Sequence, residues 1–250
     1  MIFCCFAGFA RSGTSLVGSI LNAHPKCAVS HELDVVTKLL DNGVSREQAF
    51  QMIINKVGEE AQKGKRWCPT VDGGKYHFDK LGLSQKKLDE VEVIGDKKAG
   101  KTLFTLCGAQ ISKDATVELD RLRNIVQVPI RVLICHRDPF SVFSALKMGG
   151  HPFGIKWCSF DRMMGHIDLL RKVLAPEELI EVWLEELTSK PQEELRRIFQ
   201  RLGVVASDEF ISSMASHVWS KPNRRSCLNE SEVAEVKAAI EKYDFLKMRM

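Results

Sequence analysis

The first residues that could do chemistry form an anion-binding pattern near the beginning of the chain. The stretch GFARSGTS, residues 8–15, follows an apolar run and precedes a helical pattern. Gly8 and Gly13 allow the backbone to approach a ligand closely, and Arg11 adds a fixed positive charge. The same stretch carries three hydroxyl donors: Ser12, Thr14 and Ser15. Because N–H groups and the helix dipole favour anions at a helix N-terminus, the pattern predicts an anion-binding loop.

A second glycine motif competes for this role. GDKKAGKT, residues 95–102, matches the pattern G-x-x-x-x-G-K-[ST] of nucleoside-triphosphate loops, which the first stretch lacks. VLICHRD could then be the strand that ends in a magnesium-binding Asp138. This alternative predicts a P-loop kinase or NTPase. The first loop already provides a site of the same kind, however, so we favour it over the second. The HRD at 136–138 also occurs in protein kinases, but neither G-x-G-x-x-G nor D-F-G is present.

Four blocks resemble, in order, the sulfotransferases that use 3′-phosphoadenosine 5′-phosphosulfate (PAPS). RSGTSLVGSILNAHP is similar to the loop that binds the 5′-phosphosulfate, and VIGDKKAG to the strand followed by a lysine. VLICHRDPFSVFSALKM is similar to the segment that binds the 3′-phosphate. LIEVWLEELTSKPQEELRRIFQRLGV is similar to the later strand and helix of the family. Together the blocks cover about half of the chain.

The resemblance implies transfer of a sulfuryl group from PAPS to an acceptor hydroxyl, giving a sulfate ester and 3′,5′-ADP. It implies that Glu32 is the general base, as in the similar tyrosylprotein sulfotransferases, with His31 as the rival. Arg11 and Lys97 would stabilise the transferred group, with Lys98 as the alternative to Lys97. Cationic side chains can serve where phosphoryl transfer recruits magnesium, so no metal is expected. A related protein that binds the nucleotide without turnover is a further alternative.

The 3′-phosphate segment has a basic and a hydroxyl candidate. Arg137 suits a phosphate because its guanidinium can form two parallel hydrogen bonds. The serine that many family members carry eight residues later is replaced by alanine here, so Ser144 is the better candidate and Ser141 the other. The basic stretch SKPNRRS could close over the same phosphate through Arg224 or Arg225.

The elements that must position these residues alternate between strands and helices. Short apolar runs predict strands at 2–7, 91–94, 130–135 and 179–183. Helical patterns follow at 15–22, from about 140, within 188–203 and at 231–245. This alternation predicts one domain over residues 1–250, a three-layer α/β/α fold with a central parallel sheet, similar to the P-loop nucleoside kinases. Residues 64–88 have no clear period and predict a loop or a substrate-facing insertion.

The composition fits a cytoplasmic protein, and the resemblance then implies a small hydroxyl compound as the acceptor. The 250 residues are 44% hydrophobic and 27% charged, which is ordinary for a globular domain. The net charge of +4 is too small to indicate a nucleic-acid partner, and no apolar run is long enough to span a membrane. The eight cysteines include no C-x-x-C pair, so we expect reduced thiols and no zinc site. The oligomeric state is not indicated.

Overall fold

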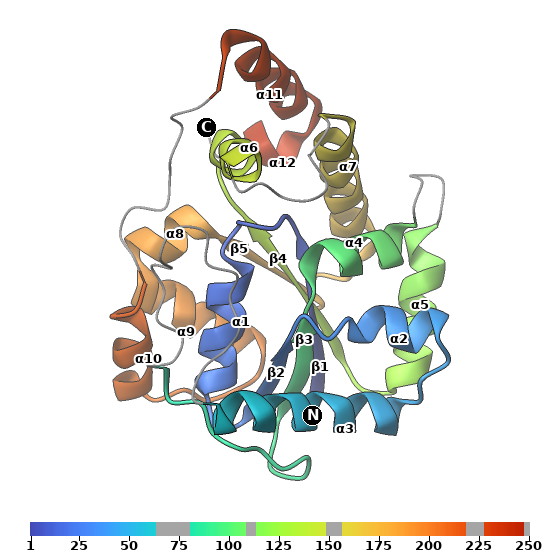
Figure 1. Cartoon of the computed structure of the whole chain (residues 1–250), viewed down its shortest axis with the longest axis vertical. Coiled ribbons are helices and arrows are strands. Elements are labelled where there is room, and N and C mark those ends of the chain that lie inside the picture. The colour runs from blue at the N-terminus through green and yellow to red at the C-terminus, as the bar shows by residue number, and fades with distance from the viewer. Residues whose placement is uncertain (64–80, 109–113, 149–156, 219–227, 248–250) are drawn as a thin grey trace.

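A parallel sheet forms the centre of the protein. The computed structural model describes residues 1–63, 81–108, 114–148, 157–218 and 228–247. The strands within these ranges are β1 (Ile2–Gly8), β2 (Cys27–His31), β3 (Val93–Lys97), β4 (Ile130–His136) and β5 (Leu179–Trp183). Their order is β2-β3-β1-β4-β5 and each neighbouring pair is parallel (Figure 1). The carboxyl ends of the strands therefore meet at one edge of the sheet.

Helices cover both faces of this sheet. In chain order they are α1 (Thr14–Ala23), α2 (Val35–Asp41), α3 (Arg46–Gln62), α4 (Ala99–Cys107), α5 (Ala115–Val126), α6 (Pro139–Met148), α7 (Trp157–Val173), α8 (Leu184–Ser189), α9 (Pro191–Arg201), α10 (Asp208–Ala215), α11 (Glu230–Lys242) and α12 (Asp244–Lys247). One face packs against α1, α8, α9 and α10, and the other against α2, α3, α4, α5 and α7 (Figure 1). The fold is therefore a three-layer α/β/α arrangement, as the sequence predicts.

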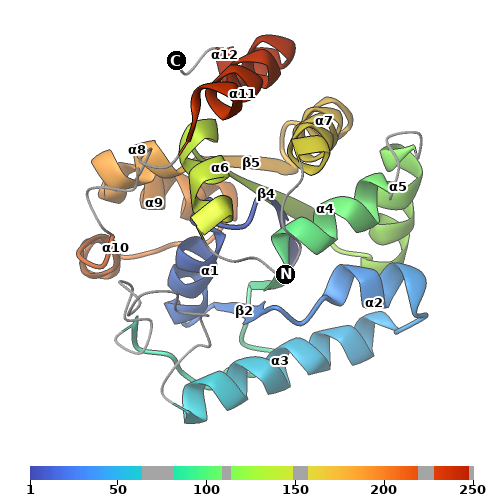
Figure 2. The ribbon, with the colours of Figure 1, turned by 45° about the horizontal axis from the view of Figure 1, so that its top comes forward.

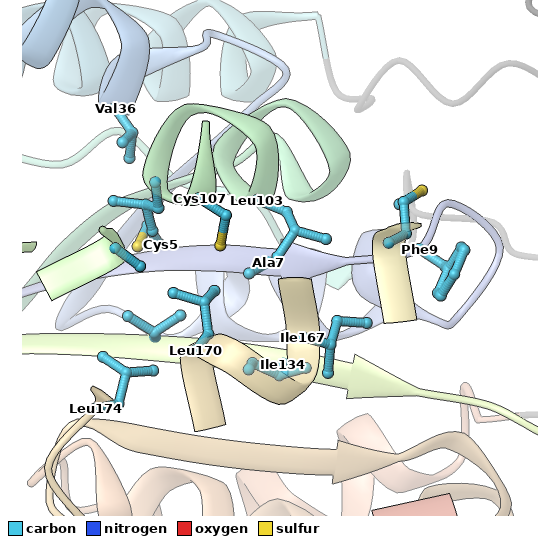
Figure 3. Packing of buried hydrophobic residues seen from close by; sticks show 14 of the residues in the cluster. Cys5, Ala7, Phe9, Val36, Leu103, Cys107, Ile134, Ile167, Leu170 and Leu174 are labelled. Carbon is cyan, nitrogen blue, oxygen red and sulfur yellow. The ribbon is translucent and has the colours of Figure 1, made fainter. Parts of the chain in front are cut away.

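The central strand β1 contributes side chains to both layers. Cys5 and Ala7 pack with Leu103 of α4 and Leu170 of α7 (Figure 3), whereas Phe6 packs on the α1 side. Because a strand buried on both faces needs apolar residues at every position, the unbroken run in β1 is explained by its place in the middle of the sheet.

The four predicted strands are confirmed, with the second one displaced by two to three residues to β3. The remaining strand, β2, was not predicted, and it lies at an edge of the sheet. The region 188–203 contains the end of α8 and all of α9, and the predicted last helix is divided into α11 and α12. Of the region 64–88, residues 64–80 lie outside the described part, and 81–88 form neither an α-helix nor a strand. Among the described helices, none has both the length and the apolar character needed to cross a bilayer.

Candidate active site

The predicted site residues that are described gather at the carboxyl edge of the sheet. Arg11 follows β1, Glu32 follows β2, Lys97 ends β3, and Arg137 follows β4. In the parallel sheet these four positions belong to adjacent strands, in the order β2-β3-β1-β4. Figure 2 shows the same region with α6 between α8 and α4, and with α11 and α12 beyond the end of the sheet. In open α/β sheets, ligands bind outside the carboxyl ends of the strands.

The loop between β1 and α1 has the features of an anion-binding loop. Arg11 and Gly13 have positive φ angles of 71° and 84°, and Gly13 is the N-cap of α1 without any side-chain cap. The first turn of α1 carries no acidic residue, so its positive end is not neutralised locally. Ser12 is 2% exposed, and its hydroxyl has no hydrogen-bond partner within the described residues. These features fit a group that brings phosphate or sulfate oxygens to the loop.

The neighbours of this loop explain why glycine occurs twice in it. A Cβ on Gly8 would lie 3.1 Å from the carbonyl oxygen of Cys135, and a Cβ on Gly13 would lie 2.8 Å from the Leu184 side chain. Gly8 also has a φ of 118°, which side chains disfavour. The loop can therefore follow this path only with glycine at both positions. Of the remaining predicted loop residues, Thr14 is buried, Ser15 is half-buried and Arg11 is exposed.

Glu32 bridges two lysines at the end of the neighbouring strand β3 and the start of α4. Its Oε1 accepts a hydrogen bond from Lys97 Nζ, and its Oε2 accepts one from Lys98 Nζ at 2.6 Å. The side chain of Lys97 is almost fully buried, whereas those of Glu32 and Lys98 are about one-third exposed. Burial of the carboxyl acts to raise the pKa of Glu32, but attraction and hydrogen bonds from both lysines outweigh burial, and the net shift is downward. The carboxylate is thus charged and balanced by two cations.

The aliphatic part of Lys97 passes close to α1. A Cβ on Gly18 would lie 3.3 Å from both Cβ and Cγ of Lys97, so the absence of a side chain there leaves room for the lysine. His31 pairs with Lys97 in the register of β2 and β3, and it is 5% exposed. The structure therefore brings Lys97, Lys98 and Glu32 into contact, with His31 buried at the end of the neighbouring strand.

Arg137 reaches the first loop across a long sequence separation. Its Nη1 donates a hydrogen bond to the carbonyl oxygen of Arg11 at 2.9 Å. Of the two serine candidates on α6, Ser141 donates to Asp138 Oδ2 at 2.7 Å, and Ser144 is fully buried. The hydroxyl of Ser141 thus serves the first turn of α6. Arg224 and Arg225, predicted near the 3′-phosphate, lie outside the described residues.

The second glycine motif does not form a phosphate loop. Residues 95–97 belong to β3, Lys98 is the N-cap of α4, and the helix begins at Ala99. No loop separates the strand from the helix, so the backbone cannot wrap around a phosphate as a nucleoside-triphosphate loop does. Gly95 has a packing reason instead, because a Cβ there would lie 2.0 Å from the carbonyl oxygen of Cys4. The alternative built on residues 95–102 is not supported by this geometry.

Two polar groups near the site escaped the sequence analysis. Asp96 is 2% exposed and accepts hydrogen bonds from Ser30 and from the backbone that follows β2. Burial raises the pKa of Asp96 by more than these hydrogen bonds lower it. Its signal in the sequence was its position inside a strand, directly after apolar residues and a glycine.

The second group lies beside β4 and β5. Glu181 accepts from His136 at 2.9 Å and from Arg171 at 2.7 Å. Burial acts to raise the pKa of Glu181, but the hydrogen bonds and charges of these two partners outweigh it and lower the pKa to about 2. Trp183 stacks on the His136 ring at a centroid distance of 4.6 Å. This network fixes the end of β4 immediately before Arg137, and alternation along β5 was the only sequence signal for it.

Comparison with known proteins places this geometry in a family. A sequence model described as the sulfotransferase family matches residues 4–208. The structure of a sulfotransferase from Alicyclobacillus acidocaldarius is similar, with a TM-score of 0.53, 12% identity, and coverage of 99% of this chain and 96% of that one. The sulfotransferase domain of the Synechococcus PCC 7002 olefin synthase has a TM-score of 0.51 and 13% identity, covering 98% and 95%.

Mouse sulfotransferase SULT7A1 in complex with PAP has a TM-score of 0.52 and 10% identity, covering 99% of this chain and 89% of that one. At these identities the structures support the fold alone. No curated protein sequence matches this one significantly. The family match runs from within β1 to the start of α10 and includes every described residue of the candidate site. The chain therefore belongs to the sulfotransferase family.

Proposed function

We propose that this protein transfers a sulfuryl group from PAPS to the hydroxyl of a small acceptor, producing a sulfate ester and 3′,5′-ADP. The observation that carries the proposal is the hydrogen bond between Arg137 and the Arg11 carbonyl. It joins the two segments that the family resemblance assigns to the two phosphates of one nucleotide. The five cysteines whose side chains are described are all free thiols, which agrees with a reducing compartment such as the cytoplasm.

The donor would be held at two points. The loop of Arg11, Ser12, Gly13, Thr14 and Ser15 would bind the 5′-phosphosulfate through N–H groups, hydroxyls and the Arg11 charge. Arg137 would bind the 3′-phosphate, assisted by Ser144 and by Arg224 or Arg225. Because a guanidinium can bind a phosphate through two parallel hydrogen bonds, Arg137 would distinguish 3′-phosphorylated nucleotides from ordinary ones.

The transfer step would use the Glu32–Lys97 pair. The acceptor oxygen forms a bond to sulfur while the bond between sulfur and the phosphate oxygen breaks, and the electron pair leaves with 3′,5′-ADP. Lys97 and Arg11 would stabilise the charge on the bridging and sulfuryl oxygens. An anionic sulfuryl group would also compete with Glu32 for Lys97. Loss of that partner would raise the basicity of Glu32 when the donor is bound, and Glu32 would then take the acceptor proton.

Thermal unfolding with three nucleotides tests the donor assignment. We expect 3′,5′-ADP to raise the melting temperature without magnesium, and ADP without a 3′-phosphate to do much less. At one hundred times Kd, a ligand of the native state stabilises it by about 2.7 kcal/mol, or roughly 5–10 °C for a domain of this size. A larger shift with ATP and magnesium than with 3′,5′-ADP would overturn the proposal in favour of a kinase or NTPase.

The identity of the base is tested by the pH dependence of the rate. Glu32→Gln should lower kcat by about 10²–10⁴-fold and remove the acidic limb of the profile. The affinity for 3′,5′-ADP should stay close to that of the wild type, because the carboxylate faces the acceptor. His31→Ala is the comparison, and loss of the limb in that variant alone would make His31 the base.

A further inference from the structure

The loop that holds Glu32 has an unfavourable backbone conformation. Glu32 and Asp34 have φ angles of 60° and 62°, in the left-handed region that residues with a Cβ disfavour. Only Leu33 separates the two residues, and the segment directly follows β2. Such a conformation persists only where the surrounding structure imposes it, so something outside the loop must hold it in place.

The carboxylate of Asp96 supplies this restraint. Its Oδ1 accepts from Ser30 Oγ at 2.8 Å and from the Leu33 N–H at 3.1 Å. Its Oδ2 accepts from the Val35 N–H at 3.2 Å. One side chain from β3 therefore binds the last part of β2 and the backbone on both sides of Asp34. Because three donors from this segment meet the two oxygens of one buried side chain, the restraint acts at several points at once.

The side chain of Asp96 makes no hydrogen bond to the Glu32 side chain among those that the structure describes, but the next residue of β3, Lys97, does. Its neighbour Lys97 contacts the Glu32 side chain, and the Lys97 carbonyl oxygen accepts from the Glu32 N–H at 3.0 Å. Asp96 is 2% exposed, whereas the Glu32 side chain is 32% exposed. The buried carboxylate can therefore act on the chemistry only through the position of the exposed one.

We propose that Asp96 is a positioning residue, which holds the β2–α2 loop so that the Glu32 carboxylate meets Lys97 and the acceptor. This inference rests on the proposed role of Glu32 in sulfuryl transfer. Asp96→Asn tests it, because an amide keeps the shape of the side chain but puts an N–H₂ group against backbone N–H donors. We expect kcat to fall by about 10- to 100-fold, the loss that a small misplacement of a reacting group causes. Affinity for 3′,5′-ADP should stay within about threefold.

A double-mutant cycle distinguishes positioning from general stability. If Asp96 acts through Glu32, then Asp96→Asn should cost no more than about twofold in kcat when Glu32→Gln is already present. A loss of the same size in both backgrounds would overturn the proposal. Glu178→Gln is the matched control, because Glu178 also accepts a backbone N–H, from Ala175 at 3.1 Å, but at the opposite edge of the sheet. It should leave kcat unchanged.

Hydrogen exchange gives a result that does not depend on the reaction. In Asp96→Asn the amides of Leu33 and Val35 should exchange faster, and unchanged protection would overturn the proposal. If these amides respond but Glu32→Gln has no effect on kcat, the role of Glu32 is wrong and the restraint by Asp96 still stands. Should Asp96→Asn not fold, Ser30→Ala removes one bond to the same carboxylate. It should give a smaller loss of kcat that likewise disappears in the Glu32→Gln background.

Discussion

Replacing Gly18 by alanine sets two effects against each other at a single position. Gly18 lies inside α1, where alanine is favoured over glycine by about 1 kcal/mol. The new methyl group, however, would lie 3.3 Å from Cβ and Cγ of Lys97 and 3.6 Å from the Phe6 ring. Carbon atoms normally stay about 3.5–4.0 Å apart, so the lysine must move by a few tenths of an ångström.

Overpacking of this kind typically costs about 1–3 kcal/mol, so it should cancel or exceed the gain in helix propensity. We therefore expect Gly18→Ala to leave the melting temperature unchanged or to lower it by a few degrees. Because Lys97 contacts Glu32, its displacement should also lower kcat, by about tenfold. Misplacement by about 1 Å can cost as much as 10²-fold, and the shift here is smaller.

Gly58→Ala is the matched control for this experiment. Gly58 lies inside α3, and a Cβ there would meet no atom within 4 Å. It should gain up to about 1 kcal/mol, or roughly 2–4 °C in melting temperature, with kcat unchanged. Thermal unfolding and steady-state kinetics of both variants measure the contrast. If Gly18→Ala gains as much stability as Gly58→Ala and keeps its kcat, Lys97 does not need the room that Gly18 leaves.

Three further predictions concern other parts of the chain. Arg137→Ala should weaken binding of 3′,5′-ADP by roughly 10- to 150-fold and of 5′-AMP hardly at all in calorimetric titration, and equal losses would contradict its role at the 3′-phosphate. Glu181 has a folded pKa of about 2 against an ordinary 4.5. Its contribution to the free energy of unfolding is therefore fully present above about pH 4.5 and is lost as the pH falls toward 2. In urea unfolding at pH 7, the free energy of unfolding of Glu181→Gln should be lower than that of the wild type by up to about 3 kcal/mol. A difference of the same size between the two proteins near pH 2 would refute the reasoning. Burial raises the pKa of four thiols to about 12, so iodoacetamide should modify them only after unfolding, as peptide mapping by mass spectrometry can show: Cys5, Cys27, Cys107 and Cys135.

Sequence reasoning predicted the parts of the fold whose signals are local. The apolar run of β1 and its glycine turn are continuous in the sequence, and so is the strand before Arg137. The strand β2 was missed because it ends in Ser30 and His31, so that its apolar run is only three residues long. Its pairing with β3, from a segment about 65 residues away, supplies the backbone hydrogen bonds that make it a strand.

Contacts in the site were harder to predict than the residues that make them. The sequence named Glu32 and Lys97 separately, as a base and as a cation, and gave no sign that they form an ion pair. Asp96 was read only as a variable position within a glycine motif. Its role depends on the N–H groups of a loop with positive φ angles, and such angles at residues other than glycine have no signature in the sequence.

The bond between Arg137 and the Arg11 carbonyl spans 126 residues, and this distance has a consequence for how the protein matures. Parallel strands that are far apart in sequence pair slowly, because a long loop must close before any contact forms. During synthesis, the first loop leaves the ribosome long before β4 exists, so the segments assigned to the two phosphates meet only after most of the sheet has been made. The proposed nucleotide site would then be complete only once just over half of the 250 residues, including four of the five described strands, have been made. Nucleotide would act on the later steps of folding and leave the earlier ones untouched.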